Sequence, residues 1–360
     1  MAGRKNIEAL AVHFTAGVAA GTLVLRLPVS PYFLAGTLLI FLASLTAIVL
    51  RTERPVLIGP AFFLLGAFCA LADAFPGVET ATFPERWAAS LGKRAKDFID
   101  SIPFPSEGTV PLLKALLTGD RSGLSRETIQ VFRESGGAHL LALSGLHIGI
   151  LYLFLSRLLW PLGNSPRARG IRYVLTVLAA ALFTLVTGAS PSIVRAFLFI
   201  FINETARLTG RPRNVLRVLS TALLVQLVLD PSAITSVGFQ LSYLAMAGIF
   251  ILYPRLEAWW PKGPRIDPLR KVWQAAALSI SCQAFTGPLA WYRFHTFPTY
   301  FLITNLLAMP VTTLLMGTAV TTLALQGLGC CPAFLIQVTD ALCSALTWIL
   351  KVISSMCNPG

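Results

Sequence analysis

Three polar side chains lie close together in an otherwise apolar stretch, the segment HLLALSGLHIGI from His139 to Ile150. Ser144 and His147 are three residues apart, so on a helix they share one face. Polar and ionisable groups are costly to desolvate at membrane depth, and they therefore mark pathways or hydrogen-bonded contacts between helices. One hypothesis is that His139, Ser144 and His147 line a polar path. The alternative is that they only join helices and bind no ligand.

A hydrolytic site at these residues is a weaker interpretation. Ser144 is not part of a GxSxG elbow, and no acidic residue nearby could orient the His147 imidazole. The six cysteines show no pairing with each other or with histidine at metal-ligand spacing. We therefore expect no catalytic residue, no metal site and no cofactor.

Arg195 is the best candidate for holding a phosphate group within an apolar span. It follows the sequence GASPS at 188–192, in which Gly188 and Pro191 break the helix. Broken membrane helices expose backbone groups at the ligand sites of transporters. The alternative is that Arg195 extends to the membrane interface, as arginines near helix ends commonly do.

Other residues in the apolar spans extend this list. Asp340 is an intramembrane acid that could couple protons, although an isolated acid is often simply paired with a neighbouring helix. Gly145 and Gly149 have GxxxG spacing, which predicts close packing against another helix. The polar residues that could line a path in the later spans are Gln240, Ser242, Gln283 and Asn305.

The composition identifies the class of protein that must position these residues. Hydrophobic residues make up 55% of the chain and charged residues only 12%. A soluble domain is about 25% charged, so the chain is predicted to be an all-α polytopic membrane protein. The net charge of +13 is weak evidence for nucleic-acid binding, because cytoplasmic loops of membrane proteins also collect Lys and Arg.

Apolar runs predict about nine to eleven transmembrane helices in three regions. Residues 1–75 form N-terminal transmembrane helices, residues 76–137 an extramembrane helical segment, and residues 138–357 the main membrane domain. In the middle segment Trp87, Leu91, Phe98 and Ile102 recur at helical spacing, which predicts an amphipathic helix in the membrane interface. The expected spans are 9–27, 31–50, 55–75, 138–160, 171–188, 191–206, 214–229, 236–253, 272–291, 300–326 and 332–356.

The distribution of basic residues predicts the orientation. Seventeen of the 29 basic residues fall in alternate loops, which become cytoplasmic if the N-terminus is cytoplasmic. The segment 76–137 is then external. The seventeen residues are Arg4, Lys5, Arg51, Arg54, Arg157, Arg167, Arg169, Arg172, Arg207, Arg211, Arg213, Arg217, Arg255, Lys262, Arg265, Arg270 and Lys271.

Four ordered motifs resemble the ComEC family of competence proteins, over about residues 85–315. They are LLTGDRSGLSRETIQVFRESGGAHLLALSGLHIGI from Leu116, SPSIVRAFLF from Ser190, DPSAITSVGFQLSYLAMAGI from Asp230 and NLLAMPVTTLL from Asn305. The resemblance implies a multi-pass channel in the bacterial inner membrane that passes single-stranded DNA into the cytoplasm. It also implies separate soluble partners, namely a DNA receptor, a nuclease and a cytoplasmic ATPase.

Full-length ComEC proteins also carry an OB-like domain and a metallo-β-lactamase-like domain. This chain has no HxHxDH motif among its four histidines, so it looks like the membrane module alone and no nuclease activity is expected. Two other functions stay open: a proton-coupled transporter of a small anionic solute, and a non-transporting membrane scaffold. A homo-oligomer is also left open.

Overall fold

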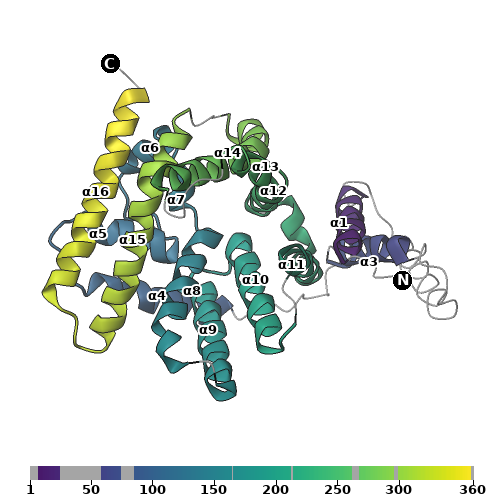
Figure 1. The fold of residues 1–360 in the computed structure, drawn as a ribbon, viewed down its shortest axis with the longest axis horizontal. Helices are drawn as coiled ribbons and strands as arrows, with labels where there is room; N and C mark the ends of the chain where they lie inside the picture. The colour runs from purple at the N-terminus through teal and green to yellow at the C-terminus, as the bar shows by residue number, and fades with distance from the viewer. Residues whose placement is uncertain are drawn as a thin grey trace. The chain divides into compact units, whose positions relative to one another are not determined.

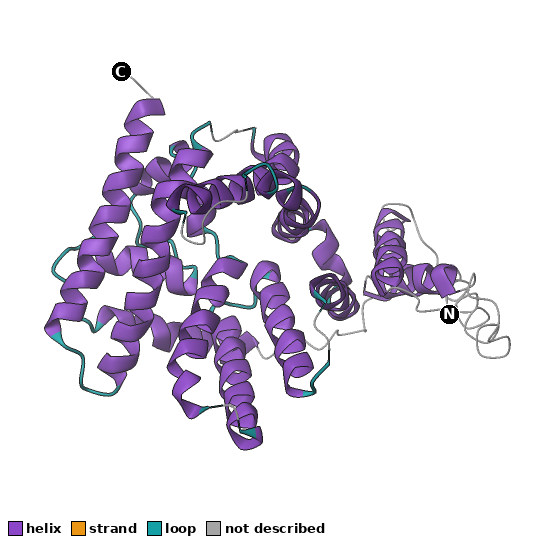
Figure 2. Ribbon diagram, in the orientation of Figure 1, coloured by secondary structure: helices purple, strands orange, loops and turns teal. Residues whose placement is uncertain are grey.

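A computed structural model describes residues 7–24, 58–73, 85–163, 165–211, 214–261, 267–295 and 299–357, with the backbone alone for 85–88. Within these ranges every regular element is a helix, as Figure 2 shows. The chain divides into two compact units. The expected span 31–50 and the side chain of Trp87 lie outside the described residues.

The first unit contains Met1–Glu85, Gly163–Val177 and Val194–Phe239. Two further helices, α9 (Pro166–Val186) and α10 (Pro191–Leu208), belong partly to this unit and partly to the second. The elements that lie wholly in the first unit are α1 (Ile7–Val24), α3 (Ile58–Asp73), α11 (Val215–Leu229) and the short 3₁₀ helix η3 (Pro231–Thr235).

Small residues allow α1 and α3 to pack backbone against backbone. A Cβ atom at Gly17 of α1 would collide with the carbonyl of Phe63, and one at Gly66 of α3 would collide with the carbonyl of Phe14. Such close approach is a common way for membrane helices to associate, because lipid supplies no hydrophobic drive between them.

The second unit contains Arg86–Leu162, Leu178–Ile193 and Gln240–Gly360. Its helices are α4 (Glu85–Asp100, except Glu85), α5 (Thr109–Thr118), α6 (Arg126–Glu134), α7 (Ala138–Leu141), α8 (Gly145–Leu158), η2 (Trp160–Leu162), α12 (Val237–Ile251, except its first three residues), α13 (Tyr253–Glu257), α14 (Pro268–Phe294), α15 (Phe301–Gly327) and α16 (Ala333–Cys357).

The core of the second unit forms where α5 meets α15 and α16. The two long helices run side by side, and α5 packs against both (Figure 1). Leu116 of α5, Leu315 of α15 and Leu346 of α16 are fully buried there. The ten residues of α5 extend only about 15 Å, too short to cross a bilayer. Part of the expected extramembrane segment is thus a buried core helix.

Five helical segments are long and apolar enough to cross a membrane, and four shorter apolar helices accompany them in the described ranges. This confirms the predicted all-α, multi-pass membrane class. The five segments are Ile7–Val24, Pro166–Val186, Val237–Glu257, Phe301–Gly327 and Ala333–Met356.

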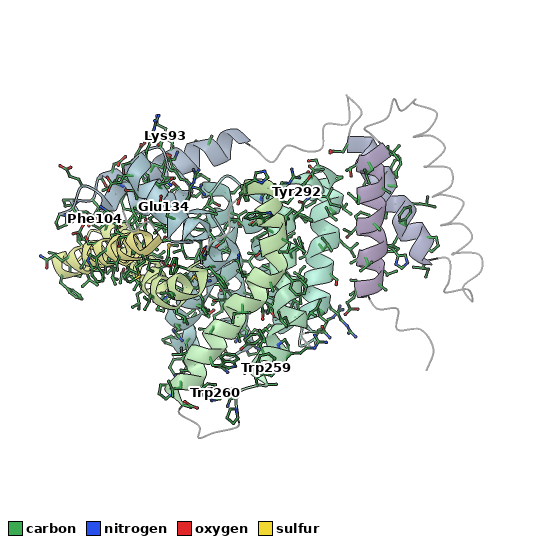
Figure 3. The ribbon with its side chains drawn as sticks, turned by 90° about the horizontal axis from the view of Figure 1, so that it is seen from above. Lys93, Phe104, Glu134, Trp259, Trp260 and Tyr292 are labelled. Atoms are coloured by element: carbon green, nitrogen blue, oxygen red, sulfur yellow. The ribbon has the colours of Figure 1, made fainter. Side chains whose placement is uncertain are left out.

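Aromatic side chains mark both ends of α14. Figure 3 shows Trp259 and Trp260 near one end of this helix and Tyr292 near the other. Trp259 and Tyr292 are each 72% exposed, while the Trp260 indole donates to Asp267 at 3.0 Å. Trp and Tyr favour the two membrane interfaces, so this arrangement is typical of a helix that crosses from one interface to the other.

Candidate functional site

The apolar run predicted as one span over 138–160 is broken in the structure. Helix α7 ends at Leu141, Ala142 and Ser144 have extended backbones, and α8 begins at Gly145 and ends at Leu158. The prediction of a single helix was therefore wrong. The physical reason is Ser144, whose side chain accepts a hydrogen bond from the Leu146 N–H at 3.3 Å and caps the new helix.

His147 completes this cap from the third position of α8. Its Nδ1 atom accepts a hydrogen bond from the Ser144 N–H at 3.2 Å, and the Ser144 hydroxyl lies 3.1 Å from the same nitrogen. This is a capping box in which His takes the place usually held by Glu or Gln. Ser144 and His147 are therefore partners across a helix terminus, a role that helical spacing alone does not predict.

The cap also fixes which nitrogen of His147 carries the proton. Since Nδ1 accepts from a backbone N–H, the neutral ring must be protonated at Nε2. The side chain is 1% exposed, and Nε2 has no hydrogen-bond partner among the described residues. An unpaired buried donor costs about 1–3 kcal/mol, so this N–H is available to an oxygen atom that enters the site.

His139 and Asn305 meet on the other side of the break. His139 Nδ1 lies 3.0 Å from the Gly136 carbonyl oxygen, and its ring lies near the Asn305 side chain. His139 is exposed, and it is close enough to His147 for the two rings to interact electrostatically. Asn305 Oδ1 is buried and has no hydrogen-bond partner in the described part of the chain. Of the predicted residues, His139, Ser144, His147 and Asn305 thus form one polar cluster.

The loop before the cluster holds the break in place. Gly119 ends α5 in the left-handed conformation (φ 79°), and a Cβ atom there would lie 2.5 Å from Leu143. Arg121 donates to the Leu141 carbonyl through Nε at 3.1 Å and Nη2 at 2.8 Å. This guanidinium satisfies the last carbonyl of α7, which has no partner within so short a helix. The sequence analysis singled out neither residue, although the run TGDRSGLS around them is rich in turn-forming residues.

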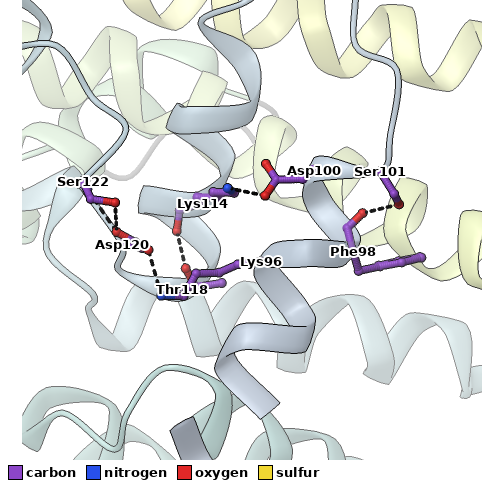
Figure 4. Close-up of polar contacts among 8 residues, drawn as sticks. All are labelled: Lys96, Phe98, Asp100, Ser101, Lys114, Thr118, Asp120 and Ser122. Atoms are coloured by element: carbon purple, nitrogen blue, oxygen red, sulfur yellow. Dashed lines mark hydrogen bonds and ion pairs between the residues drawn. The ribbon is translucent and has the colours of Figure 1, made fainter. Parts of the chain in front are cut away.

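Two ion pairs join α4 to the same loop and to α5 (Figure 4). Lys96 lies 2.7 Å from Asp120, and Lys114 lies 2.6 Å from Asp100. Asp120 also accepts hydrogen bonds from the backbone and the hydroxyl of Ser122. The Lys96 ammonium and these Ser122 donors hold the pKa of the Asp120 carboxyl well below its ordinary value. The ion pair between Lys96 and Asp120 therefore holds the loop that carries Arg121 against α4.

Asp340 takes part in a different contact. Its carboxylate accepts hydrogen bonds from Ser106 N–H at 3.1 Å, Ser106 Oγ at 2.8 Å and Thr109 Oγ1 at 2.5 Å. These donors lie in the turn before α5 and at its first residue, so the carboxylate ties α16 to the start of α5. The geometry favours a structural role for Asp340, and proton coupling stays an untested prediction.

The remaining candidates lie elsewhere. Arg195 belongs to the first unit, is half-buried with its Nη1 atom enclosed, and has a polar or electrostatic partner. Gln240 and Ser242 are half-buried on α12. Gln283 lines an open, mainly apolar groove beside Pro288 of α14.

The predicted close packing at the GxxxG pair is not seen at Gly149. A Cβ atom there would meet no described atom within 4 Å. Gly145 is the first residue of α8, where it follows the Ser144 cap. Close backbone contact occurs instead at Gly248 of α12, where a Cβ atom would collide with the carbonyl of Ser281.

Comparison with known proteins identifies the family. The model of the family described as "Competence protein" matches residues 116–359, which include the cluster and the loop that positions it. The chain belongs to the competence protein family.

Several curated proteins are similar to this chain. The chain is 27% identical to ComE operon protein 3 of Bacillus subtilis over 61% of its own length and 27% of the relative's. It is 32% identical to competence protein ComA of Neisseria gonorrhoeae, over 56% of this chain and 28% of that protein. The chain thus spans about a quarter of these relatives. No solved structure matches it.

Among the described residues, no group of three or more His, Cys, Asp or Glu side chains is placed to hold a metal ion. The polar cluster offers groups that donate and accept hydrogen bonds.

Proposed function

We propose that this chain is the membrane module of a channel that takes single-stranded DNA across the bacterial cell membrane, with the cluster His139, Ser144, His147 and Asn305 on the DNA path. Membership of the competence protein family supports the substrate class. The observation that carries the location is the buried Nε2–H of His147, a donor with no partner in the described residues.

Phosphate and base oxygens are the natural partners for such a donor. The His147 N–H and the buried Asn305 Oδ1 offer one donor and one acceptor within the same cluster. Neutral groups of this kind can bind a nucleotide without holding it tightly, and a conducting path needs binding weak enough for release. No residue in this proposal performs catalysis, and the soluble DNA receptor, nuclease and ATPase remain separate partners.

The test is transformation with purified DNA in cells that carry substitutions at the cluster. His147→Gln keeps a side-chain acceptor for the Ser144 N–H, so the cap and the fold are retained, while the Nε2–H donor is lost from its position. We expect the number of transformants to fall at least about tenfold, as expected for a lost buried hydrogen bond.

The matched control is His13→Gln in α1, where the imidazole makes a local contact to the Ala9 carbonyl. This variant should transform normally. Normal transformation by a stably expressed His147→Gln variant would remove the cluster from the DNA path. Loss of proton-driven uptake of a small anion, with transformation unchanged, would instead identify a solute transporter.

A further inference from the structure

Three arginines gather in a small pocket of the first unit, and none of them belongs to the polar cluster described above. Arg169 and Arg172, near the start of α9, and Arg207, at the end of α10, line it together with Tyr173, Glu204 and Leu208. The pocket has a cavity volume of about 20 Å³. It has room for about one oxygen-sized group.

The pocket is held in shape by contacts between its two helices and within each. The Tyr173 hydroxyl lies 3.1 Å from the Thr205 hydroxyl, which ties α9 to α10. Arg172 donates to the Gly163 carbonyl at 3.1 Å. Glu204 is 6% exposed and lies 3.7 Å from Arg207. The buried Glu204 carboxylate attracts the Arg207 guanidinium and keeps it beside the pocket.

The charge of the pocket suits an anion. Three guanidinium groups and one carboxylate leave a net charge of +2. Guanidinium groups bind phosphate oxygens through paired N–H donors, which is why arginine is preferred at phosphate sites. Glu204 removes part of the positive charge, and a phosphodiester with a single negative charge balances half of the remaining +2.

The surroundings of the pocket are apolar. Ile171, Val174 and Leu175 of α9 are 50%, 56% and 41% exposed, and Leu208 at the rim is 40% exposed. Only 17% of the best apolar window of α9 is buried inside the protein, as expected for a helix that packs against lipid. A basic pocket at the end of such a helix lies at the depth of the lipid headgroups.

We propose that the pocket formed by Arg169, Arg172, Glu204 and Arg207 binds the phosphate of an anionic phospholipid, whose acyl chains lie along the exposed apolar side chains of α9. The narrow interior takes one phosphate oxygen, and the headgroup rests at the mouth. A nucleic acid or a free phosphate has no acyl chain that could pack against the exposed apolar side chains of α9. This inference does not depend on DNA passage.

The test uses the full chain purified in detergent and measured by native mass spectrometry with added lipid. The wild-type protein should retain phosphatidylglycerol in preference to phosphatidylcholine, which has the same acyl chains and no net charge. The double variant Arg169→Gln/Arg207→Gln should weaken phosphatidylglycerol binding at least about tenfold, because two charge-assisted contacts are lost. Its phosphatidylcholine binding should not change.

The matched control is Arg157→Gln/Arg217→Gln, which removes two exposed arginines outside the pocket. It should bind phosphatidylglycerol as the wild type does. Equal weakening in both double variants would show attraction by net charge alone and would overturn the proposal. So would displacement of the lipid by millimolar inorganic phosphate, or by a single-stranded oligonucleotide that binds the wild type but not the pocket variant.

Discussion

His147 has two roles at the residue scale, one for each ring nitrogen. Nδ1 belongs to the helix cap through Ser144, and Nε2 is buried without a described partner. A substitution that keeps only the first role should separate stability from function. The same division could not be predicted from the sequence, because the spacing of Ser144 and His147 fits a shared helix face as well as a capping box.

The two roles of His147 give a prediction about stability. His147→Ala removes the capping acceptor and should destabilise the protein by about 0.5–1 kcal/mol, whereas His147→Gln should be close to the wild type. Thermal unfolding in detergent measures the difference. If the two variants unfold at the same temperature, the cap contributes nothing to stability.

Asp120 gives a prediction about pH. Its folded-state pKa is lowered, chiefly by the Lys96 hydrogen bond, so its contribution to stability is present above the unfolded pKa of about 3.9. That contribution is lost as the pH falls below about 4 towards the folded-state value. Asp120→Asn should therefore unfold at a lower temperature than the wild type at about pH 7, and the two should converge as the pH falls below about 4. A difference that persists unchanged in acid would show that the ion pair with Lys96 is not its source.

At the scale of elements, the break between α7 and α8 is imposed by the loop before it. Gly119 leaves room for Leu143, and Arg121 binds the carbonyl of Leu141. Ser125 begins α6 as a typical N-cap residue, and its hydroxyl accepts a hydrogen bond from the Thr128 N–H at 3.1 Å. A cap is a local interaction and can be predicted from neighbours. The contacts of Gly119 and Arg121 join residues about twenty positions apart and cannot.

The burial of α5 was missed for a related reason. Helix α5 has only ten residues, too few to be predicted as a membrane-spanning helix. Segments with charged residues flank it on both sides. Only the tertiary structure shows that Asp340 of α16 binds Ser106 and Thr109 at its start and that α15 and α16 cover its leucines. The all-α membrane class, by contrast, follows from composition, which does not depend on such contacts.

Two glycines provide a matched test of this element. Gly119→Ala adds a methyl group at a left-handed position and against Leu143, so it should destabilise the protein by about 1 kcal/mol or more. Gly149→Ala adds the same group inside α8 in open space, and it should be neutral or stabilising by up to about 1 kcal/mol. Thermal unfolding of the two variants compares them directly. The reverse order would mean that the break is not held through Gly119.

At the scale of the whole molecule, the prediction concerns orientation. The basic loops are predicted to be cytoplasmic and 76–137 external, on the bias of seventeen basic residues. In a background without native cysteines, Glu107→Cys should react with an impermeant maleimide in intact cells. Thr209→Cys should react only after the membrane is opened. The opposite pattern would invert the topology.

We propose that DNA moves along the polar cluster at the break before α8. The direct measurement is photo-crosslinking during uptake of labelled DNA, with p-benzoylphenylalanine introduced at one position. His139→p-benzoylphenylalanine, or Ala138→p-benzoylphenylalanine beside it, places the probe at an exposed residue of the cluster. Leu153→p-benzoylphenylalanine places it on an exposed side chain of α8 as the control. In cells that still take up DNA, we predict crosslinks to the labelled single strand from 138 or 139 and none from 153. Continued uptake with no crosslink from either cluster position would contradict the claim.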